Sequence, residues 1–84
     1  MKIGLAGSLE SNDCIITVEE SNELEIKIES IVYDYFSSQI RKVILNTLEE
    51  LEVKTIKVFI NDKGALDYTI RSRLIIAIKR MEAS

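Results

Sequence analysis

The hydrophobic period of this chain changes along its length, and each change limits which element a segment is able to form. Apolar and polar residues alternate over residues 13–20, 23–30 and 53–61. A period of two predicts strands that bury one face. Over residues 31–52 and 66–81 the apolar residues recur at three- and four-residue spacing instead, which predicts two amphipathic helices. The predicted order is β-β-α-β-α.

Each predicted strand has one apolar and one polar face, so the sheet should be covered on one side only. Both helices should pack on that side, which gives an α+β two-layer sandwich with a three-stranded mixed sheet. The crossover from residues 23–30 to residues 53–61 should be right-handed, which makes these two strands parallel. The short polar link of residues 20–22 suits a hairpin between the first two strands.

The length of 84 residues is that of one domain, and we expect a single α+β domain over residues 13–84. Residues 1–12 precede the first alternating segment. They are expected to form a flexible N-terminal arm outside the core, within which residues 3–5 are able to pair on a sheet edge.

Charge and residue types argue against several classes of function. The net charge of −3 disfavours a nucleic-acid or anionic-membrane partner, because both need a dense basic face. The chain contains no histidine, and Cys14 alternates toward the core, where a thiol is usually inert. With no zinc spacing or phosphate-binding loop either, neither metal ligands nor catalytic residues are predicted. The lone cysteine and the lack of a signal-like or membrane-spanning apolar run predict a cytoplasmic protein.

Residues 6–13 (AGSLESND) form a small, polar segment that offers a serine as an attachment point. Together with residues 62–67 (DKGALD), this segment resembles the acyl carrier subunit (gamma chain) of citrate lyase. The resemblance covers essentially the whole chain, with both motifs in the same order and at the same separation. In that family a serine in a Leu-Glu-Ser-x-Asp context carries a prosthetic group, which implies that Ser11 is the attachment residue here.

The resemblance also implies a cofactor, partners and a mechanism. The group attached to Ser11 would be 2'-(5''-phosphoribosyl)-3'-dephospho-CoA, transferred by a separate holo-carrier synthase. The partners would be the alpha and beta subunits of citrate lyase. The alpha subunit exchanges the acetyl thioester for a citryl thioester, and the beta subunit cleaves citryl to oxaloacetate and regenerates acetyl-carrier. The chain itself would be a non-catalytic carrier subunit.

Two alternatives stay open. The related acyl carrier subunit of malonate decarboxylase uses a similar prosthetic group, but it more typically shows Gly-Ser-Gly-Asp where this chain has Leu9-Glu10-Ser11-Asn12-Asp13. The chain could also be an unmodified structural adaptor domain. Ser8 is the competing hydroxyl near the motif, and in the family its position is not the attachment point.

The second motif, residues 62–67, lies where the third strand gives way to the second helix. We predict a structural role for it: Asp62 accepts from amides at the helix start, Gly64 adopts an unusual backbone conformation, and Asp67 meets the positive end of the helix dipole. A contact of Lys63 with the phosphates of the prosthetic group is a weaker alternative, because it requires Ser11 to lie nearby. Ser30 is the predicted N-cap of the first helix.

Apolar side chains are also expected on the uncovered face of the sheet. Ile15 and Phe59 alternate with residues that face the core. If their strands are neighbours, these two residues form part of a patch for docking to larger subunits.

Overall fold

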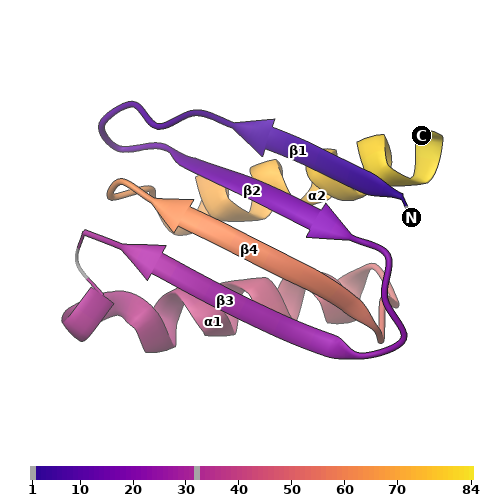
Figure 1. Ribbon diagram of the computed structural model, residues 1–84. Helices are drawn as coiled ribbons and strands as arrows, with labels where there is room; N and C mark the ends of the chain where they lie inside the picture. The colour runs from indigo at the N-terminus through magenta and orange to yellow at the C-terminus, as the bar shows by residue number, and fades with distance from the viewer. Residues whose placement is uncertain (1, 32) are drawn as a thin grey trace.

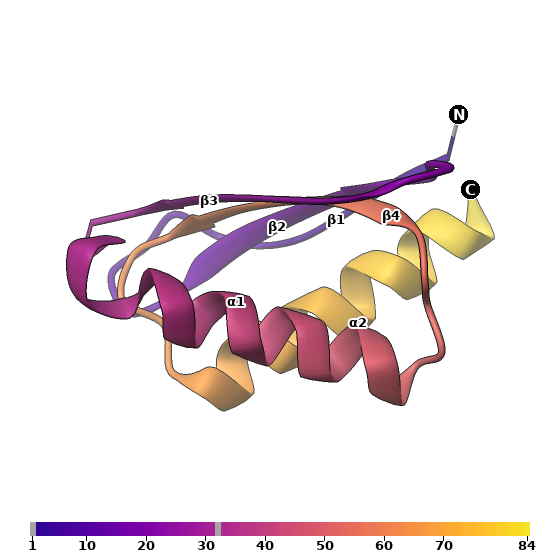
Figure 2. The same cartoon turned by 90° about the horizontal axis from the view of Figure 1, so that it is seen from below.

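The structure is a computed structural model that describes residues 2–31 and 33–84, without the side chains of residues 33–35. It has a four-stranded sheet and two helices (Figure 1). Figure 2 shows the sheet edge-on, with both helices against one face. The elements in chain order are β1 (Ile3–Gly7), β2 (Cys14–Glu19), β3 (Leu24–Ser30), α1 (Tyr33–Glu50), β4 (Ile56–Asp62) and α2 (Asp67–Ala83).

The two-layer α+β architecture is as predicted, but the strand count is not. The strand order is β1-β2-β4-β3. The parallel pairing predicted for residues 23–30 and 53–61 is confirmed by the β3–β4 register, whereas β2 pairs with β4 in antiparallel orientation. Both predicted helices form, and Val32, which falls within the first predicted range, lies outside the described residues.

The predicted hairpin through residues 20–22 is wrong, because β4 lies between β2 and β3. Burial explains the order: the inward side chains of β4, among them Ile56 and Ile60, are fully buried, whereas Leu24 on β3 remains 47% exposed. The most completely buried strand takes a central place, and the half-buried one takes an edge. The link from β2 to β3 crosses β4, a distance of roughly 10 Å, which residues 20–23 reach at about 3.3 Å per extended residue.

The prediction that residues 1–12 form a flexible arm outside the core is wrong, whereas the pairing expected of residues 3–5 on a sheet edge is confirmed. Ile3–Gly7 pairs antiparallel with β2 as an edge strand, so the sheet has four strands and not three. The inward residues of β1 are Gly4 and Ala6, while Ile3 and Leu5 point outward and are about half exposed. This pattern is the reverse of an ordinary half-buried strand, which explains why alternation did not indicate one.

Gly4 allows β1 to lie directly against α2. A Cβ atom at this position would come within 1.9 Å of the Ala77 carbonyl oxygen and 2.5 Å of the Met81 amide nitrogen. No side chain fits there, because both obstacles belong to the helix backbone. The close contact is visible where the C-terminal part of α2 passes behind β1 (Figure 1).

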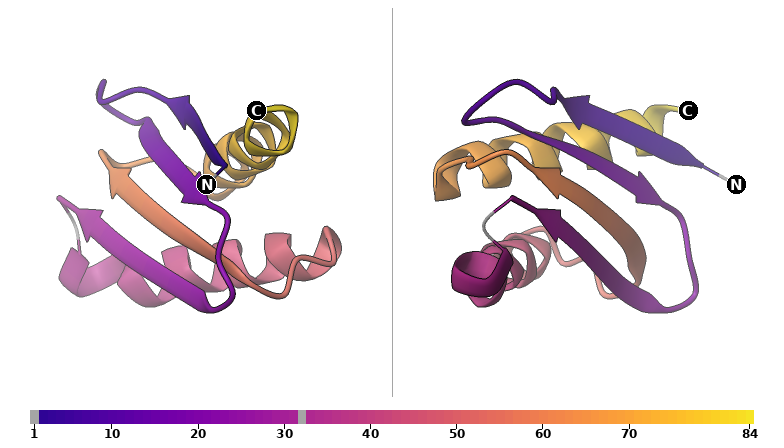
Figure 3. Two further views of the ribbon diagram at one scale, coloured as in Figure 1. Left: turned by 45° about the vertical axis from the view of Figure 1, so that its right-hand side comes forward. Right: turned by 60° about the vertical axis from the view of Figure 1, so that its left-hand side comes forward.

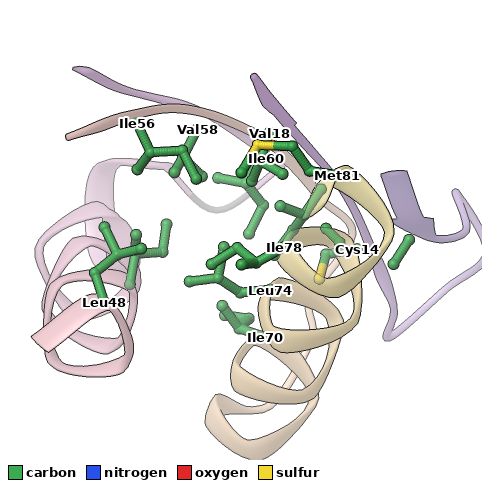
Figure 4. Packing of buried hydrophobic residues seen from close by; sticks show 14 of the residues in the cluster. Cys14, Val18, Leu48, Ile56, Val58, Ile60, Ile70, Leu74, Ile78 and Met81 are labelled. Carbon is green, nitrogen blue, oxygen red and sulfur yellow. The ribbon is translucent and has the colours of Figure 1, made fainter. Parts of the chain in front are cut away.

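The core lies between the sheet and the two helices (Figure 4). Branched aliphatic side chains dominate it, and Cys14 is fully buried among them, as the sequence predicts. The largest fully buried apolar side chains are Ile16, Val18, Ile44, Ile56, Val58, Ile60, Ile70 and Leu74. Two polar residues are also buried. Thr47 donates to the Val43 carbonyl oxygen at 2.8 Å, and Asp62 belongs to the site described below.

Neither of the two described helices covers the opposite face of the sheet, which carries several apolar side chains. Phe59 pairs in register with Thr17, which in turn pairs with Leu5, so these three side chains form one row across the sheet. Ile15 lies one step along β2 on the same face. We call Ile3, Leu5, Ile15 and Phe59 the outer-face patch; the condition set for it, that β2 and β4 are neighbours, is met.

Among the described residues, no helix is both long and apolar enough to cross a membrane. The cytoplasmic location stays a prediction.

Candidate functional site

Both sequence motifs lie at the same end of the molecule. The loop of residues 8–13 joins β1 to β2, and the loop of residues 63–66 joins β4 to α2. In Figures 1 and 3 both loops lie at one end of the sheet, beside the point where β3 ends and α1 begins. Three connections therefore converge there, which is the arrangement expected of a functional end on a rigid scaffold.

The two loops are joined by a pair of backbone hydrogen bonds. The Asn12 amide donates to the Lys63 carbonyl oxygen at 2.8 Å, and the Lys63 amide donates to the Asp13 carbonyl oxygen at 2.9 Å. The second motif is thereby fixed directly beside Ser11, although the two are far apart in the sequence. A role of Lys63 at the phosphates of the prosthetic group requires this proximity, and the structure meets that condition.

Ser11 is exposed at the turn of the first loop. The next residue, Asn12, has a left-handed backbone with φ of 66°. Asparagine adopts this conformation more readily than most residues. The turn therefore places Ser11 outward, while the amide of the next residue, Asn12, donates a hydrogen bond to Lys63 of the second loop.

Ser8, the competing hydroxyl, is in a different environment. It is half-buried, and its hydroxyl donates to Asp13 Oδ2 at 2.7 Å while accepting from the Glu10 amide at 3.3 Å. Both of these contacts close the loop on itself. The Ser8 hydroxyl thus has a structural function, whereas Ser11 presents its hydroxyl to solvent.

Asp13 anchors the loop to α2 through a bidentate ion pair. Arg73 donates from Nε to Asp13 Oδ1 at 3.1 Å and from Nη2 to Oδ2 at 2.9 Å. The Cys14 amide also donates to Oδ1, at 2.7 Å. The Arg73 hydrogen bonds, helped by those from Ser8 and Cys14, lower the pKa of Asp13 to about 2 against the opposing effect of its burial.

Arg73 is a site residue that neither sequence motif indicates. The family motif contained its partner Asp13, but 60 positions separate the two residues. No local pattern joins positions so far apart, so only the fold could show this contact.

Asp62 organises the second loop from a buried position. Its carboxylate accepts from the Ser30 hydroxyl at 2.9 Å, from the Gly64 amide at 3.2 Å and from the Ala65 amide at 2.9 Å. The structural role predicted for Asp62 is correct, but the amides that it binds precede the helix. The N-cap of α2 is Leu66, which makes no side-chain cap hydrogen bond, so Asp62 holds the turn rather than the helix end.

The remaining predictions for this end of the molecule are largely confirmed. Gly64 has φ of 93°, a left-handed conformation that side chains rarely adopt. Asp67 lies in the first turn of α2 and also accepts from Gln39 Nε2 of α1 at 2.7 Å. Burial raises the pKa of the Cys14 thiol to about 12, which keeps it protonated and unreactive near neutral pH. Ser30 is the last residue of β3, and its role as a cap of α1 stays a prediction.

In the part of the chain that the structure describes, no three His, Cys, Asp or Glu side chains are grouped as metal ligands would be. The chemistry of this end therefore rests on an exposed hydroxyl, the backbone of two joined loops and the Asp13–Arg73 pair.

Comparisons with known proteins identify the family. Residues 1–81 match a family model of acyl carrier proteins described as malonate decarboxylase delta subunit (MdcD). A citrate lyase acyl carrier protein of Treponema denticola is 45% identical over 76 residues, which cover 90% of this chain and 87% of that protein. One from Streptococcus mutans is 49% identical over 78 residues, covering 90% and 76% respectively. The chain belongs to this family of acyl carrier proteins.

Membership of the family confirms the sequence prediction that the chain is a carrier subunit and not an enzyme by itself. It also implies a covalently attached prosthetic group. The fold is found in a solved structure, a Pseudomonas malonate decarboxylase hetero-tetramer in complex with malonate. The match has a TM-score of 0.82 at 20% sequence identity and covers 95% of this chain and 84% of that chain.

The Asp13–Arg73 pair should stabilise the fold in a pH-dependent way. Asp13→Asn should lower the free energy of unfolding by about 1–3 kcal/mol at pH 7, since hydrogen bonds to charged groups are worth this much. The folded-state pKa lies below the ordinary value. The charged carboxylate therefore stabilises the fold above about pH 4, and this contribution is lost as the pH falls through about 2. Urea denaturation of both proteins from pH 7 downward measures the difference.

Glu10→Gln is the matched control, because Glu10 is an exposed carboxylate in the same loop. Its effect should stay within about ±0.5 kcal/mol. A difference between wild type and Asp13→Asn that does not shrink at low pH would contradict the role assigned to the ion pair.

Because Gly64 has a left-handed backbone conformation, its replacement should lower the free energy of unfolding most for residues that disfavour positive φ. Gly64→Val should destabilise the protein by about 1–3 kcal/mol. Gly64→Asn should cost clearly less, because asparagine tolerates positive φ and because a Cβ atom there meets nothing nearer than Asn12 Oδ1 at 3.5 Å. Lys63→Ala, next to it, should stay within about ±0.5 kcal/mol. If urea denaturation showed equal losses of unfolding free energy for the Val and Asn variants, side-chain volume and not φ would determine the effect of replacing Gly64.

Proposed function

We propose that this chain is the acyl carrier subunit of citrate lyase and that it carries 2'-(5''-phosphoribosyl)-3'-dephospho-CoA on Ser11. The relatives at 45% and 49% identity bear that name. The observation that carries the assignment of the residue is the contrast between the two hydroxyls of the loop: Ser11 is exposed, whereas Ser8 is bound to Asp13.

The surroundings of Ser11 suit a covalent attachment made by another enzyme. Attachment forms a bond between Ser11 Oγ and the phosphorus of an activated phosphate-anhydride donor. The bond from that phosphorus to its leaving phosphate group breaks in the same step, and the hydroxyl proton is lost to the transfer enzyme or to water. The reaction needs an oxygen that the transfer enzyme reaches from solvent. The exposed turn supplies this access, and the two backbone hydrogen bonds to Lys63 fix its base. When bound, the group supplies a thiol that holds acetyl or citryl as a thioester.

The chain's own residues hold and present the tether. The alpha subunit, which exchanges acetyl for citryl, and the beta subunit, which cleaves citryl to oxaloacetate, would each receive the thioester from the same carrier. Tethering keeps the thioester at high effective concentration at both sites. Lys63 adjoins this loop through its backbone, and its ammonium group is the cation that we assign to the phosphates of the tether.

The carrier subunit of malonate decarboxylase is the alternative, because the description of the matching family names that enzyme. The Leu9-Glu10-Ser11-Asn12-Asp13 sequence departs from the Gly-Ser-Gly-Asp of that subunit, and the relatives above favour citrate lyase. Reconstitution with each set of large subunits separates the two: turnover of citrate supports our proposal, and turnover of malonate alone would replace it.

Ser11 and Ser8 should respond in opposite ways to replacement by alanine. Ser11→Ala should abolish attachment, seen as the absence of a mass increase after co-expression with the holo-carrier synthase, and should leave the melting temperature nearly unchanged. Ser8→Ala should keep the attachment, yet lower stability by about 0.5–1.5 kcal/mol through loss of its hydrogen bond. Attachment that survives in Ser11→Ala, or that maps to Ser8, would exclude the assignment.

The outer-face patch should be a docking surface for the large subunits. Ile15→Lys combined with Phe59→Lys should weaken assembly with the alpha and beta subunits in size-exclusion chromatography, because charges would face an apolar contact. The isolated domain should remain folded, since Phe59 is already 42% exposed. Leu45→Lys, at an exposed apolar position on α1, is the control and should assemble normally. Full assembly of the double variant would show that the subunits dock elsewhere.

A further inference from the structure

A cleft of about 540 Å³ opens between the N-terminal half of α1 and the loop that leads into α2. This volume falls within the range of roughly 300–1,000 Å³ that is typical of small-molecule sites. Most of its wall is apolar. The side chains that line it include Phe36, Gln39, Ile40, Ala65, Leu66 and Tyr68.

Large apolar side chains surround this cleft although they are in contact with water. Phe36 is 52% exposed, Leu66 is 58% exposed and Tyr68 is 72% exposed. Single exposed apolar residues are ordinary, but a group of them around one concave site indicates a binding surface. The three come from α1, from the loop and from α2, so the fold itself brings them together.

The polar groups of the cleft suit a ligand that contains amides. Gln39 Nε2 donates to Asp67 Oδ2 at 2.7 Å, which joins α1 to α2 across the wall. A carboxylate and a side-chain amide together offer acceptors for N–H groups and donors for carbonyl groups. A chain of methylenes interrupted by amides therefore matches the cleft better than a charged or fully apolar molecule.

The cleft and the attachment loop share a wall. Gly64 lines the cleft, and a Cβ atom on Gly64 would lie 3.5 Å from Asn12 Oδ1. Asn12 follows Ser11 directly, and its amide donates a hydrogen bond to the carbonyl oxygen of Lys63, the neighbour of Gly64. A group attached to Ser11 therefore lies next to an apolar cleft, because the adjoining loop forms part of the cleft wall.

We propose that this cleft holds the pantetheine part of the group carried by Ser11 when the carrier is not engaged with a catalytic subunit. The methylenes and methyl groups would lie against Phe36 and Leu66, and the amides would meet Gln39 and Asp67. This inference rests on the proposed attachment to Ser11. Its consequence is that the terminal thiol or thioester is shielded from water and from reagents between transfers.

Alkylation of the terminal thiol by iodoacetamide tests the inference on the intact holo-carrier. Cys14 does not interfere, because it is fully buried. The thiol of the wild-type holo-carrier should react several-fold more slowly than free coenzyme A. Phe36→Ala and Leu66→Asp should each raise the rate toward that of coenzyme A. Leu45→Ala removes an equally apolar exposed side chain from α1, outside the cleft, and should leave the slow rate unchanged.

Comparison of NMR spectra of the apo and holo forms gives a second measurement that needs no variant. Attachment should shift the amide signals of residues 36–40 and 64–70, in addition to those of residues 8–13 around Ser11. This result would hold even if one of the cleft variants failed to fold.

The outcomes separate the two proposals. Intact mass is measured first: no added group on the wild-type chain contradicts the attachment itself. An attached group whose thiol reacts as fast as coenzyme A, with shifts confined to residues 8–13, overturns the cleft inference alone. A rate raised as much by Leu45→Ala as by Phe36→Ala also overturns it, because the shielding would then not depend on the cleft.

Discussion

The contacts of the Asp13 carboxylate fix the loop that holds Ser11, the residue proposed for attachment. The carboxylate ties the first loop to α2 through Arg73 and closes the loop through Ser8. The loop has little apolar anchorage of its own, since Leu9 is 55% exposed. Its position is therefore set by polar contacts, which are directional and fix a geometry, whereas apolar contacts would have drawn the loop into the core. An exposed hydroxyl on a well-placed turn is the result.

The same logic extends to the second loop, where the buried Asp62 holds the amides of Gly64 and Ala65. Two carboxylates, Asp13 in the first loop and Asp62 at the end of β4, thus position the loops at this end. The backbone hydrogen bonds from the Asn12 amide to Lys63 and from the Lys63 amide to Asp13 join the two loops. The hydrophobic core begins immediately beneath, with Cys14 and Ile60. Because polar contacts fix the two loops and apolar contacts fix the sheet below them, the loops remain accessible without loss of packing in the core.

The sequence predicts those features of the fold and the site that depend on local residue patterns, and it does not predict those that depend on contacts between distant positions. Alternation indicates that a strand buries one face, so β2, β3 and β4 were found, but alternation looks the same in an edge strand and a central one. The place of β4 between β2 and β3 was therefore missed. Pairing of residues 3–5 on a sheet edge was expected, but alternation did not indicate a full strand at β1, because its inward positions are the small residues Gly4 and Ala6. Local conformations such as that of Gly64 were predictable, since one residue determines them. The Asp13–Arg73 pair was not, because no local pattern connects positions on different elements.

The outer-face patch, the cleft and the loop that contains Ser11 are arranged as the proposed carrier function requires, with the docking surface separate from the attachment site. The outer-face patch lies on the side of the sheet away from both helices, whereas the cleft lies between the starts of α1 and α2. The loop that joins β1 to β2, which contains Ser11, lies at one end of the sheet (Figure 3). A large subunit that covers the outer face would therefore leave the attachment end and the cleft uncovered. Binding of a partner and storage of the acyl group need not compete, because the sheet separates them. The two-layer α+β scaffold supplies this uncovered sheet face, because both helices pack on the other side of the sheet.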